Sequence, residues 1–101
     1  MDMKKMMKQA QQMQARIQKA QAEVAEMTAD GTAGGGMVKA TVKGDMTVQS
    51  VEIDKIVVNP DDTEMLEDLV VAAINDAFRE MNEIAQAHLD EATGGMNIPG
   101  M

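Results

Sequence analysis

The sequence contains no cysteine, a single histidine and a single aromatic residue, Phe78, among its 101 residues. Without cysteine the chain cannot form disulfide bonds, thiolate metal ligands or a cysteine nucleophile, and one histidine cannot complete any usual zinc site. With one aromatic ring, the core must be built from Val, Ile, Leu, Ala and the 12 methionines, whose side chains are flexible and unbranched. Disulfide-stabilised folds and the usual zinc proteins are therefore excluded.

Long hydrophobic runs are also missing. No window approaches the length of a membrane span, and the first 20 residues are basic and polar, unlike a secretory signal. We therefore expect a soluble, cytoplasmic protein with no membrane partner. A chain of 101 residues has room for one domain, and so small a core favours self-association to cover the remaining apolar surface.

No set of side chains predicts an active site. Neighbouring carboxylates occur twice, in Glu67 with Asp68 and in Glu80 with Glu83. A solvated acidic helix face explains them better than a metal or glycosidase site, which would need partners that the chain lacks. His88 has no accompanying Ser, Asp or Cys constellation, and the three glycines 34–36 precede a predicted strand rather than the helix of a phosphate-binding loop. We predict no catalytic residue, no metal, no cofactor and no small-molecule substrate.

Charge is distributed unevenly along the chain. The net charge of −8 by itself argues against a nucleic-acid partner. Residues 1–22 nevertheless hold five bases against Asp2 alone, a net charge of +4, whereas residues 59–101 hold Arg79 against ten acids, a net charge of −9. The two ends of the chain therefore have opposite electrostatic character, and only the N-terminal end suits an anionic partner.

Residues 1–27 are predicted to form a projecting helix. The segment lacks Gly and Pro and is rich in Lys, Gln, Ala, Met and Glu, which favour helix. Its apolar residues alternate at spacings of three and four, the pattern of a heptad seam: Met3, Met6, Ala10, Met13, Ile17, Ala20, Val24 and Met27. The lysines fall on the side away from this seam. A helix of about 25 residues spans about 38 Å, more than so small a domain needs for its own core.

Residues 28–54 are predicted to form a small sheet. The first part of 28–36 suits a short edge strand, and the three glycines that follow suit a reversal of the chain. Residues 37–43 alternate between apolar and polar side chains, and Gly44-Asp45 suits a two-residue hairpin turn. On the return strand, from about Met46 to Ile53, Val48 and Val51 are an odd number of residues apart, so we expect a bulge near Gln49-Ser50.

Residues 61–93 are predicted to form a second helix, with Asp61 and Glu64 as its capping box. Its apolar stripe is broader than that of the first helix, so we expect it to be the main cover of the sheet. Gly94 and Gly95 end it, and residues 94–101 are predicted to be a flexible tail. The expected order is α-β-β-β-α, an α+β fold with a small antiparallel sheet and two long helices.

Taken in order, several short segments resemble the YbaB/EbfC family of bacterial nucleoid-associated proteins. They are Met-Lys-Gln-Ala-Gln-Gln-Met-Gln (7–14), Gly-Gly-Gly-Met-Val-Lys (34–39), Val-Glu-Ile-Asp (51–54), Met-Leu-Glu-Asp-Leu-Val (65–70), Ala-Ala-Ile-Asn-Asp-Ala (72–77) and Gly-Gly-Met-Asn-Ile-Pro-Gly (94–100). Each segment alone is weakly specific. Their shared order and spacing span nearly the whole chain and identify it as a member.

The resemblance implies a tweezer-like homodimer with a central β core and long projecting helices. It also implies binding of double-stranded DNA with little sequence preference, a nucleoid location, and an influence on nucleoid organisation and gene expression. DNA contact in the family is attributed to charged residues of the projecting helices, which here correspond to Lys4, Lys5, Lys8, Arg16 and Lys19. The sequence departs from this pattern in its second helix, which is almost entirely acidic.

Two hypotheses remain open at this stage. In the first, the N-terminal bases bind DNA phosphates and release counterions, so that affinity falls steeply with salt. In the second, the protein is an acidic protein–protein interaction module without direct DNA contact, because a dimer of net charge −16 is repelled by DNA everywhere except at its arms. The sequence does not specify a preferred DNA sequence, regulatory targets or higher-order assembly on DNA. It also leaves open whether the acidic helix contacts DNA or a protein partner.

Overall fold

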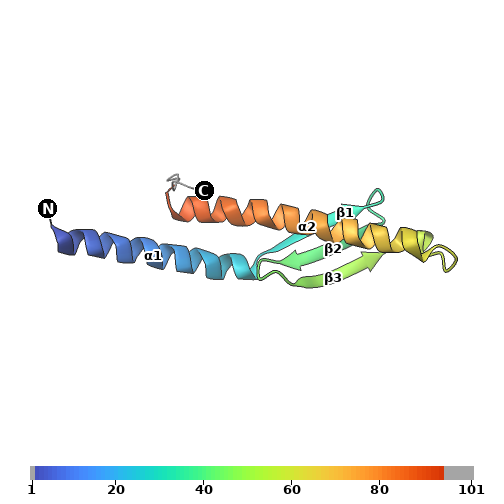
Figure 1. Ribbon diagram of the computed structural model, residues 1–101, viewed down its shortest axis with the longest axis horizontal. Coiled ribbons are helices and arrows are strands. Elements are labelled where there is room, and N and C mark those ends of the chain that lie inside the picture. The colour runs from blue at the N-terminus through green and yellow to red at the C-terminus, as the bar shows by residue number, and fades with distance from the viewer. Residues whose placement is uncertain (1, 95–101) are drawn as a thin grey trace.

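The computed structural model describes residues 2–94. It contains helix α1 (Met3–Glu26), strands β1 (Thr28–Ala33), β2 (Val38–Lys43) and β3 (Val48–Ile53), a short 3-10 helix η1 (Lys55–Val57) and helix α2 (Thr63–Ala92) (Figure 1). This order confirms the predicted α-β-β-β-α arrangement and the α+β class. The flexible tail predicted for residues 94–101 lies, apart from Gly94, outside the described residues.

The three strands form one antiparallel sheet in the order β1-β2-β3, and α2 lies across β1 and β2. Alternation along β2 buries Val38, Ala40 and Val42 completely on the face that packs against α2. The helix can approach closely because Gly31 of β1 has no side chain. A Cβ atom at Gly31 would lie 2.1 Å from the backbone nitrogen of Ala77. The core therefore lies between α2 and two of the three strands.

The N-terminus of α2 differs by one residue from the predicted capping box. Asp62 is the N-cap, and its carboxylate accepts a hydrogen bond from the Met65 amide at 3.3 Å. Asp61 instead donates its amide hydrogen to the Asn59 side chain at 3.0 Å, within the turn that precedes the helix. The prediction that Asp61 caps the helix was wrong because two adjacent aspartates compete for one cap, and the local turn takes the first.

The turn between β2 and β3 is longer than the predicted two-residue turn. It spans residues 44–47, and the Lys43 amide donates to the Thr47 carbonyl at 2.9 Å. Met46, not Gly44, adopts the positive φ, of 71°. The Thr47 hydroxyl and amide both donate to the Asp45 carboxylate, and the hydroxyl hydrogen bond is the main reason that the pKa of this carboxyl is lowered. These bonds stabilise a wider turn than the Gly-Asp pair alone suggests.

The predicted bulge on the return strand is confirmed. Thr41 pairs with Ser50 but the next residue, Val42, pairs with Val48, so Gln49 is the extra residue. The bulge brings the apolar residues of β3 to one face of the sheet, beside the buried residues of β2, in the pairs Val48–Val42, Val51–Ala40 and Ile53–Val38.

The molecule is elongated because α1 extends away from the sheet (Figure 1). Its dimensions are 72 × 22 × 16 Å and its radius of gyration is 19.4 Å, against about 13 Å for a compact domain of this length. In α1 only Ala20 and Val24 are buried, and Met3 and Met6 remain 73% and 54% exposed. The N-terminal half of α1 therefore has no packing partner among the described residues of the chain.

Candidate nucleic-acid interface

The candidate interface is the basic face of α1, which comprises Lys4, Lys5, Lys8, Arg16 and Lys19. Asp2 starts the helix by accepting hydrogen bonds from the Lys4 and Lys5 amides at 3.1 and 3.4 Å. At about 100° per residue, the five bases fall within a sector of about 120° on one side of the helix. Gln12 lies near the middle of this sector. The helix thus presents a continuous polar and cationic strip, beside the apolar seam rather than mixed with it.

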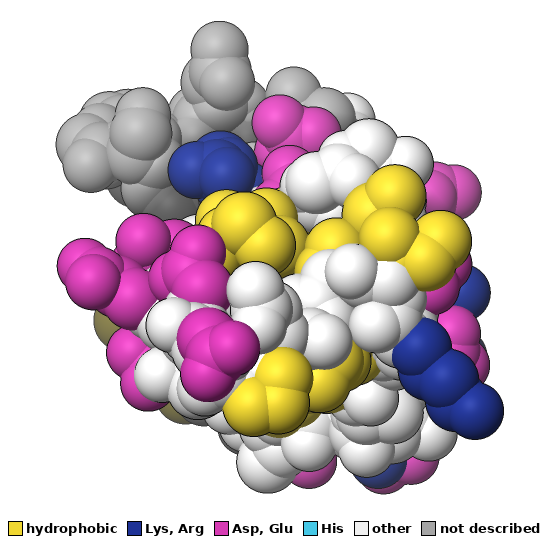
Figure 2. Space-filling model, turned by 90° about the vertical axis from the view of Figure 1, so that its right-hand side faces the viewer, with side chains coloured by type: hydrophobic (Ala, Val, Ile, Leu, Met, Phe, Trp, Pro, Cys, Tyr) yellow, Lys and Arg dark blue, Asp and Glu magenta, His cyan; other side chains and the backbone are white. Residues whose placement is uncertain are grey.

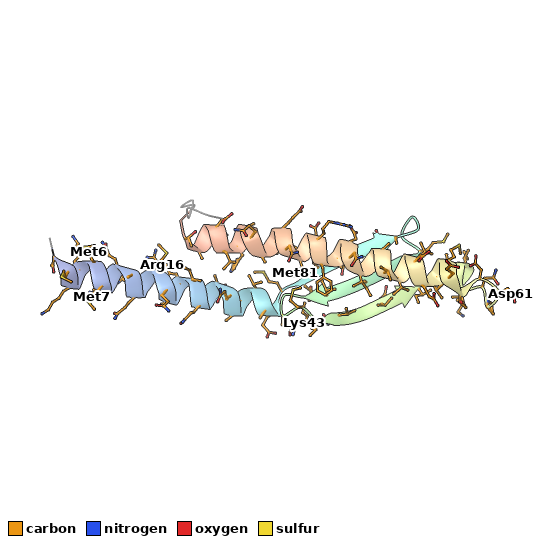
Figure 3. The ribbon with its side chains drawn as sticks, in the orientation of Figure 1. Met6, Met7, Arg16, Lys43, Asp61 and Met81 are labelled. Carbon is orange, nitrogen blue, oxygen red and sulfur yellow. The ribbon has the colours of Figure 1, made fainter. Side chains whose placement is uncertain are left out.

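All five bases are exposed to solvent, and within residues 2–94 none of them forms a salt bridge. Arg16 extends away from the helix axis, in a part of α1 that the sheet does not cover (Figure 3). The structure therefore places all five predicted DNA-binding residues on one exposed surface and leaves their charges available to an external anion.

The sheet and α2 together form what we call the body of the protein. The two glutamates of α1, by contrast with the bases, each contact a nitrogen atom of this body. Glu23 Oε2 lies 3.4 Å from Nε2 of His88 on α2, and Glu26 Oε2 lies 3.5 Å from Nζ of Lys43 on β2. By helical spacing, Glu23 and Glu26 continue the line of the basic face toward the sheet. This side of α1 is therefore cationic along its exposed length. At the C-terminal end of the helix the same side carries the two glutamates, which contact the body. These two contacts were not predicted, because neither pair has a sequence signal.

Helix α2 has the opposite character. Most of its acidic residues are exposed. Asp76 is half-buried and accepts a hydrogen bond from the Thr32 amide of β1 at 3.0 Å, and the one arginine of the helix, Arg79, lies 3.8 Å from it. Acidic side chains also gather at the end of the molecule remote from the N-terminus, beside exposed hydrophobic groups (Figure 2). An anionic partner therefore finds a favourable surface on α1 and an unfavourable one on α2.

A cleft of about 260 Å³ separates the two helices where α2 passes alongside α1. It is lined from α1 by Arg16, Lys19, Ala20 and Glu23, and from α2 by His88, Glu91 and Ala92. His88 is partly buried and its side chain faces Glu23, so the arrangement provides no nucleophile next to a base. Within the described residues, no three His, Asp or Glu side chains are grouped to hold a metal ion. Neither α1 nor α2, the two long helices of this part of the chain, has an apolar stretch of the kind that spans a membrane.

A second exposed surface lies on β3, and its extent was not predicted from the sequence. Every residue of β3 is exposed, because α2 covers only β1 and β2. Val48, Val51 and Ile53 are 44%, 37% and 41% exposed although their partners on β2 are fully buried. Ile56 and Val58, which follow the strand, are also exposed, at 77% and 50%. We call these five residues the β3 apolar face.

Comparison with known proteins places the whole arrangement in one family. The model of the YbaB/EbfC DNA-binding family matches residues 1–96. The nucleoid-associated protein Teth39_2199 of Thermoanaerobacter pseudethanolicus is 51% identical over 96 residues, which cover 95% of this chain and 86% of the relative. A nucleoid-associated protein of Nocardia farcinica is 47% identical over 100 residues, or 99% of this chain and 91% of the relative.

A solved structure has the same fold. The uncharacterized protein HP0035 from Helicobacter pylori superposes with a TM-score of 0.69 at 20% identity, over 86% of this chain and 91% of that one. At this identity the similarity concerns the fold alone. The family model and the relatives establish more: this chain belongs to the YbaB/EbfC DNA-binding family.

Proposed function

We propose that this protein is a nucleoid-associated DNA-binding protein that contacts the phosphate backbone of duplex DNA through the basic face of α1. The proposal rests on one observation. The five bases of α1 are exposed and without salt bridges within residues 2–94, while both glutamates of the same helix contact the body. In a chain of net charge −8, this is the surface that can attract a polyanion.

Contact with phosphate follows from the kind and spacing of the side chains. Lysine and arginine bind phosphate oxygens and displace condensed counterions, which supplies affinity without sequence preference. From Lys5 to Lys19 the basic face runs about 21 Å along the helix axis. Gln12, in the middle of it, can donate a hydrogen bond to phosphate or sugar. Binding of this kind would influence nucleoid organisation and gene expression by occupying DNA broadly.

Duplex DNA suits this surface better than single strands. Binding of single strands usually combines positive charge with aromatic rings on which bases stack. The chain has one aromatic residue, Phe78, which packs against the core from α2. The basic face has no ring to offer a base, so charge and shape remain as the means of recognition.

The functional unit in this proposal is a homodimer joined through the β3 apolar face. A three-stranded sheet with one strand uncovered on its apolar side leaves Val48, Val51 and Ile53 in water. A second copy would cover them and carry a second arm, which doubles the number of available bases to about ten. The rest of the dimer would stay acidic, so the two arms alone would face DNA.

The test of DNA contact is the triple charge reversal Lys4→Glu, Lys5→Glu and Lys8→Glu, measured by fluorescence anisotropy on unrelated duplexes at low salt with nuclease-treated protein. We expect the native protein to bind every duplex and the variant to lose at least a hundredfold in affinity. A matched control reverses Lys39, Lys55 and Arg79, which changes the net charge equally but leaves the basic face intact. Loss of binding in both variants, or in neither, contradicts the assignment to α1. Absence of binding by the native protein, together with capture of a protein partner, would instead support the interaction-module hypothesis.

The test of the dimer is Val51→Asp, compared with Ser50→Asp. Val51 lies on the β3 apolar face, while Ser50 pairs with Thr41 on the opposite, polar face of the sheet. We expect sedimentation to show a dimer for the native protein and for Ser50→Asp, and a monomer for Val51→Asp at the same concentration, because a buried unpaired carboxylate opposes association. A dimeric Val51→Asp protein would place the interface elsewhere.

A further inference from the structure

The junction between α1 and the body is small and well defined. Only the last two turns of α1 are buried, at Ala20 and Val24. The turn between β2 and β3 lies against the C-terminal end of the helix (Figure 1). The direction of the arm is therefore set where the last turns of α1 meet α2 and the turn between β2 and β3.

Gly44 lies directly against the backbone of α1 at this junction. Its amide donates a hydrogen bond to the Met27 carbonyl at 2.9 Å. A Cβ atom at Gly44 would lie 1.8 Å from the carbonyl oxygen of Val24 and 2.6 Å from its carbon. Gly44 is not among the residues with positive φ, so the turn itself does not require glycine there. The absence of a side chain is needed so that the turn can lie directly against the helix backbone.

Two side chains from the body contact the glutamates at the same end of the helix. Lys43, next to Gly44, lies 3.5 Å from Glu26, at the junction of helix and sheet (Figure 3). His88 of α2 lies 3.4 Å from Glu23. The lysine side chain is 30% exposed and the histidine side chain 24%. Three contacts, from the end of β2, the turn that follows it and α2, therefore meet the last two turns of α1.

We propose that Gly44, Lys43 and His88 form a joint that sets the direction of α1 and so presents the basic face to DNA. None of the three belongs to the basic face; they are positioning residues. Contacts between partly exposed polar or charged side chains contribute little individually, so the backbone contact at Gly44 is the main point of support. The consequence for DNA rests on the proposed function, whereas the geometry of the joint does not.

The length of α1 amplifies any rotation at the joint. From Ala20 to Met3 the arm extends about 26 Å, so a rotation of about 10° at the joint moves its tip by about 4.5 Å. Successive phosphates on one strand are about 3.4 Å apart along the DNA axis. A small change at the sheet therefore moves Lys4 and Lys5 by more than one phosphate step, and Lys8 by nearly one.

The joint can be tested with spin labels, because the chain has no cysteine to interfere. Labels at Gln11→Cys on α1 and Asn75→Cys on α2 report the direction of the arm by double electron–electron resonance, with labelled subunits diluted in unlabelled protein. We expect a narrow distance distribution in the native protein. Gly44→Ala should shift or broaden it, with helix content and cooperative melting retained, and should weaken duplex binding at least tenfold.

Control variants separate position from stability. Lys39→Gln removes the neighbouring outward lysine of β2, whose partner is Asp30 in the sheet, and should change neither distance nor affinity. If Gly44→Ala fails to fold, the pair Lys43→Gln with His88→Gln removes two of the three points without adding volume, and Lys43→Arg should restore the native distance in that background. Native distances in Gly44→Ala, or in the double variant, overturn the joint. If α1 changes direction but DNA affinity is unchanged, the joint has no role in binding. If α1 changes direction in a protein that never binds DNA, the proposed function is refuted and the joint is not.

Discussion

Helices α1 and α2 are similar in length and both carry an apolar stripe, yet they are used in opposite ways. α2 lies on the sheet with Ala73, Ala77 and Met81 buried, and its outer surface is acidic. α1 is buried only at Ala20 and Val24 and carries exposed bases along the remainder. The comparison shows that an apolar stripe does not by itself identify a core helix. What separates the two is whether a sheet lies against the stripe, and the helix left uncovered is free to bind another molecule.

The largest expected effect compares the same substitution in the two helices. Met81→Ala removes a side chain that is 2% exposed, and we expect a loss of about 2–5 kcal/mol in the free energy of unfolding because a cavity remains. Met6→Ala alters a side chain that is 54% exposed and should change stability by less than about 0.5 kcal/mol. Denaturant titration of both variants measures this difference. A loss above about 1 kcal/mol for Met6→Ala would show that the α1 seam is covered in the dimer, so that the arms pair instead of standing apart.

A smaller effect is expected when the two arginines, Arg16 and Arg79, are compared by the salt dependence of DNA affinity. Arg16→Gln should reduce the slope of log affinity against log salt concentration by about 0.9 for each phosphate that the variant no longer neutralises, or by about 1.8 if both arms of a dimer engage one duplex. Arg79→Gln on α2 should leave the slope unchanged, because Arg79 lies beside Asp76 on an acidic surface. Binding titrations over a range of salt concentrations measure both slopes. Equal reductions in the two variants would mean that DNA contacts α2 as well.

The smallest effect is expected when the N-caps of the two helices, Asp62 and Asp2, are compared by their contribution to stability. Asp62→Ala should cost about 1 kcal/mol of global stability, because α2 is part of the cooperative core. Asp2→Ala should fray the first turn of α1 and leave the global unfolding transition where it is, since that turn packs against nothing in the described chain. Chemical denaturation and amide hydrogen exchange distinguish the two outcomes. A clear shift in global stability for Asp2→Ala would contradict the view of α1 as an independent arm.

Features that depend on local sequence were predictable. The spacing from Met3 to Met27 predicted a long helix with its lysines opposite the seam, and the odd separation of Val48 and Val51 predicted the bulge, now placed at Gln49. Two local predictions were wrong because neighbouring residues compete for the same hydrogen bonds or add new ones. Asp61 and Asp62 are equivalent in pattern but only the second caps α2, and the hydrogen bonds of Thr47 to Asp45 widened the expected two-residue turn.

Features that depend on residues far apart in the chain were not predictable. Nothing in the sequence links Glu23 with His88 or Glu26 with Lys43, because contacts between side chains far apart in the chain leave no periodic signal. Nor does any sequence pattern indicate which strand α2 leaves uncovered. The uncovered strand is β3, because α2 approaches the sheet most closely at Gly31 of β1 and so lies over β1 and β2.

The three lysines in the first turns of α1 have one more consequence. Helices are stabilised by negative charge at the N-terminus, where backbone amides have no acceptor, and here Lys4, Lys5 and Lys8 oppose that field with Asp2 as the sole counterweight. A helix segment without tertiary packing is marginal in water. The tip of α1 should therefore exchange its amide hydrogens with solvent far sooner than α2 does. A polyanion alongside it would supply the missing negative charge, so that binding and helix formation at the tip reinforce one another.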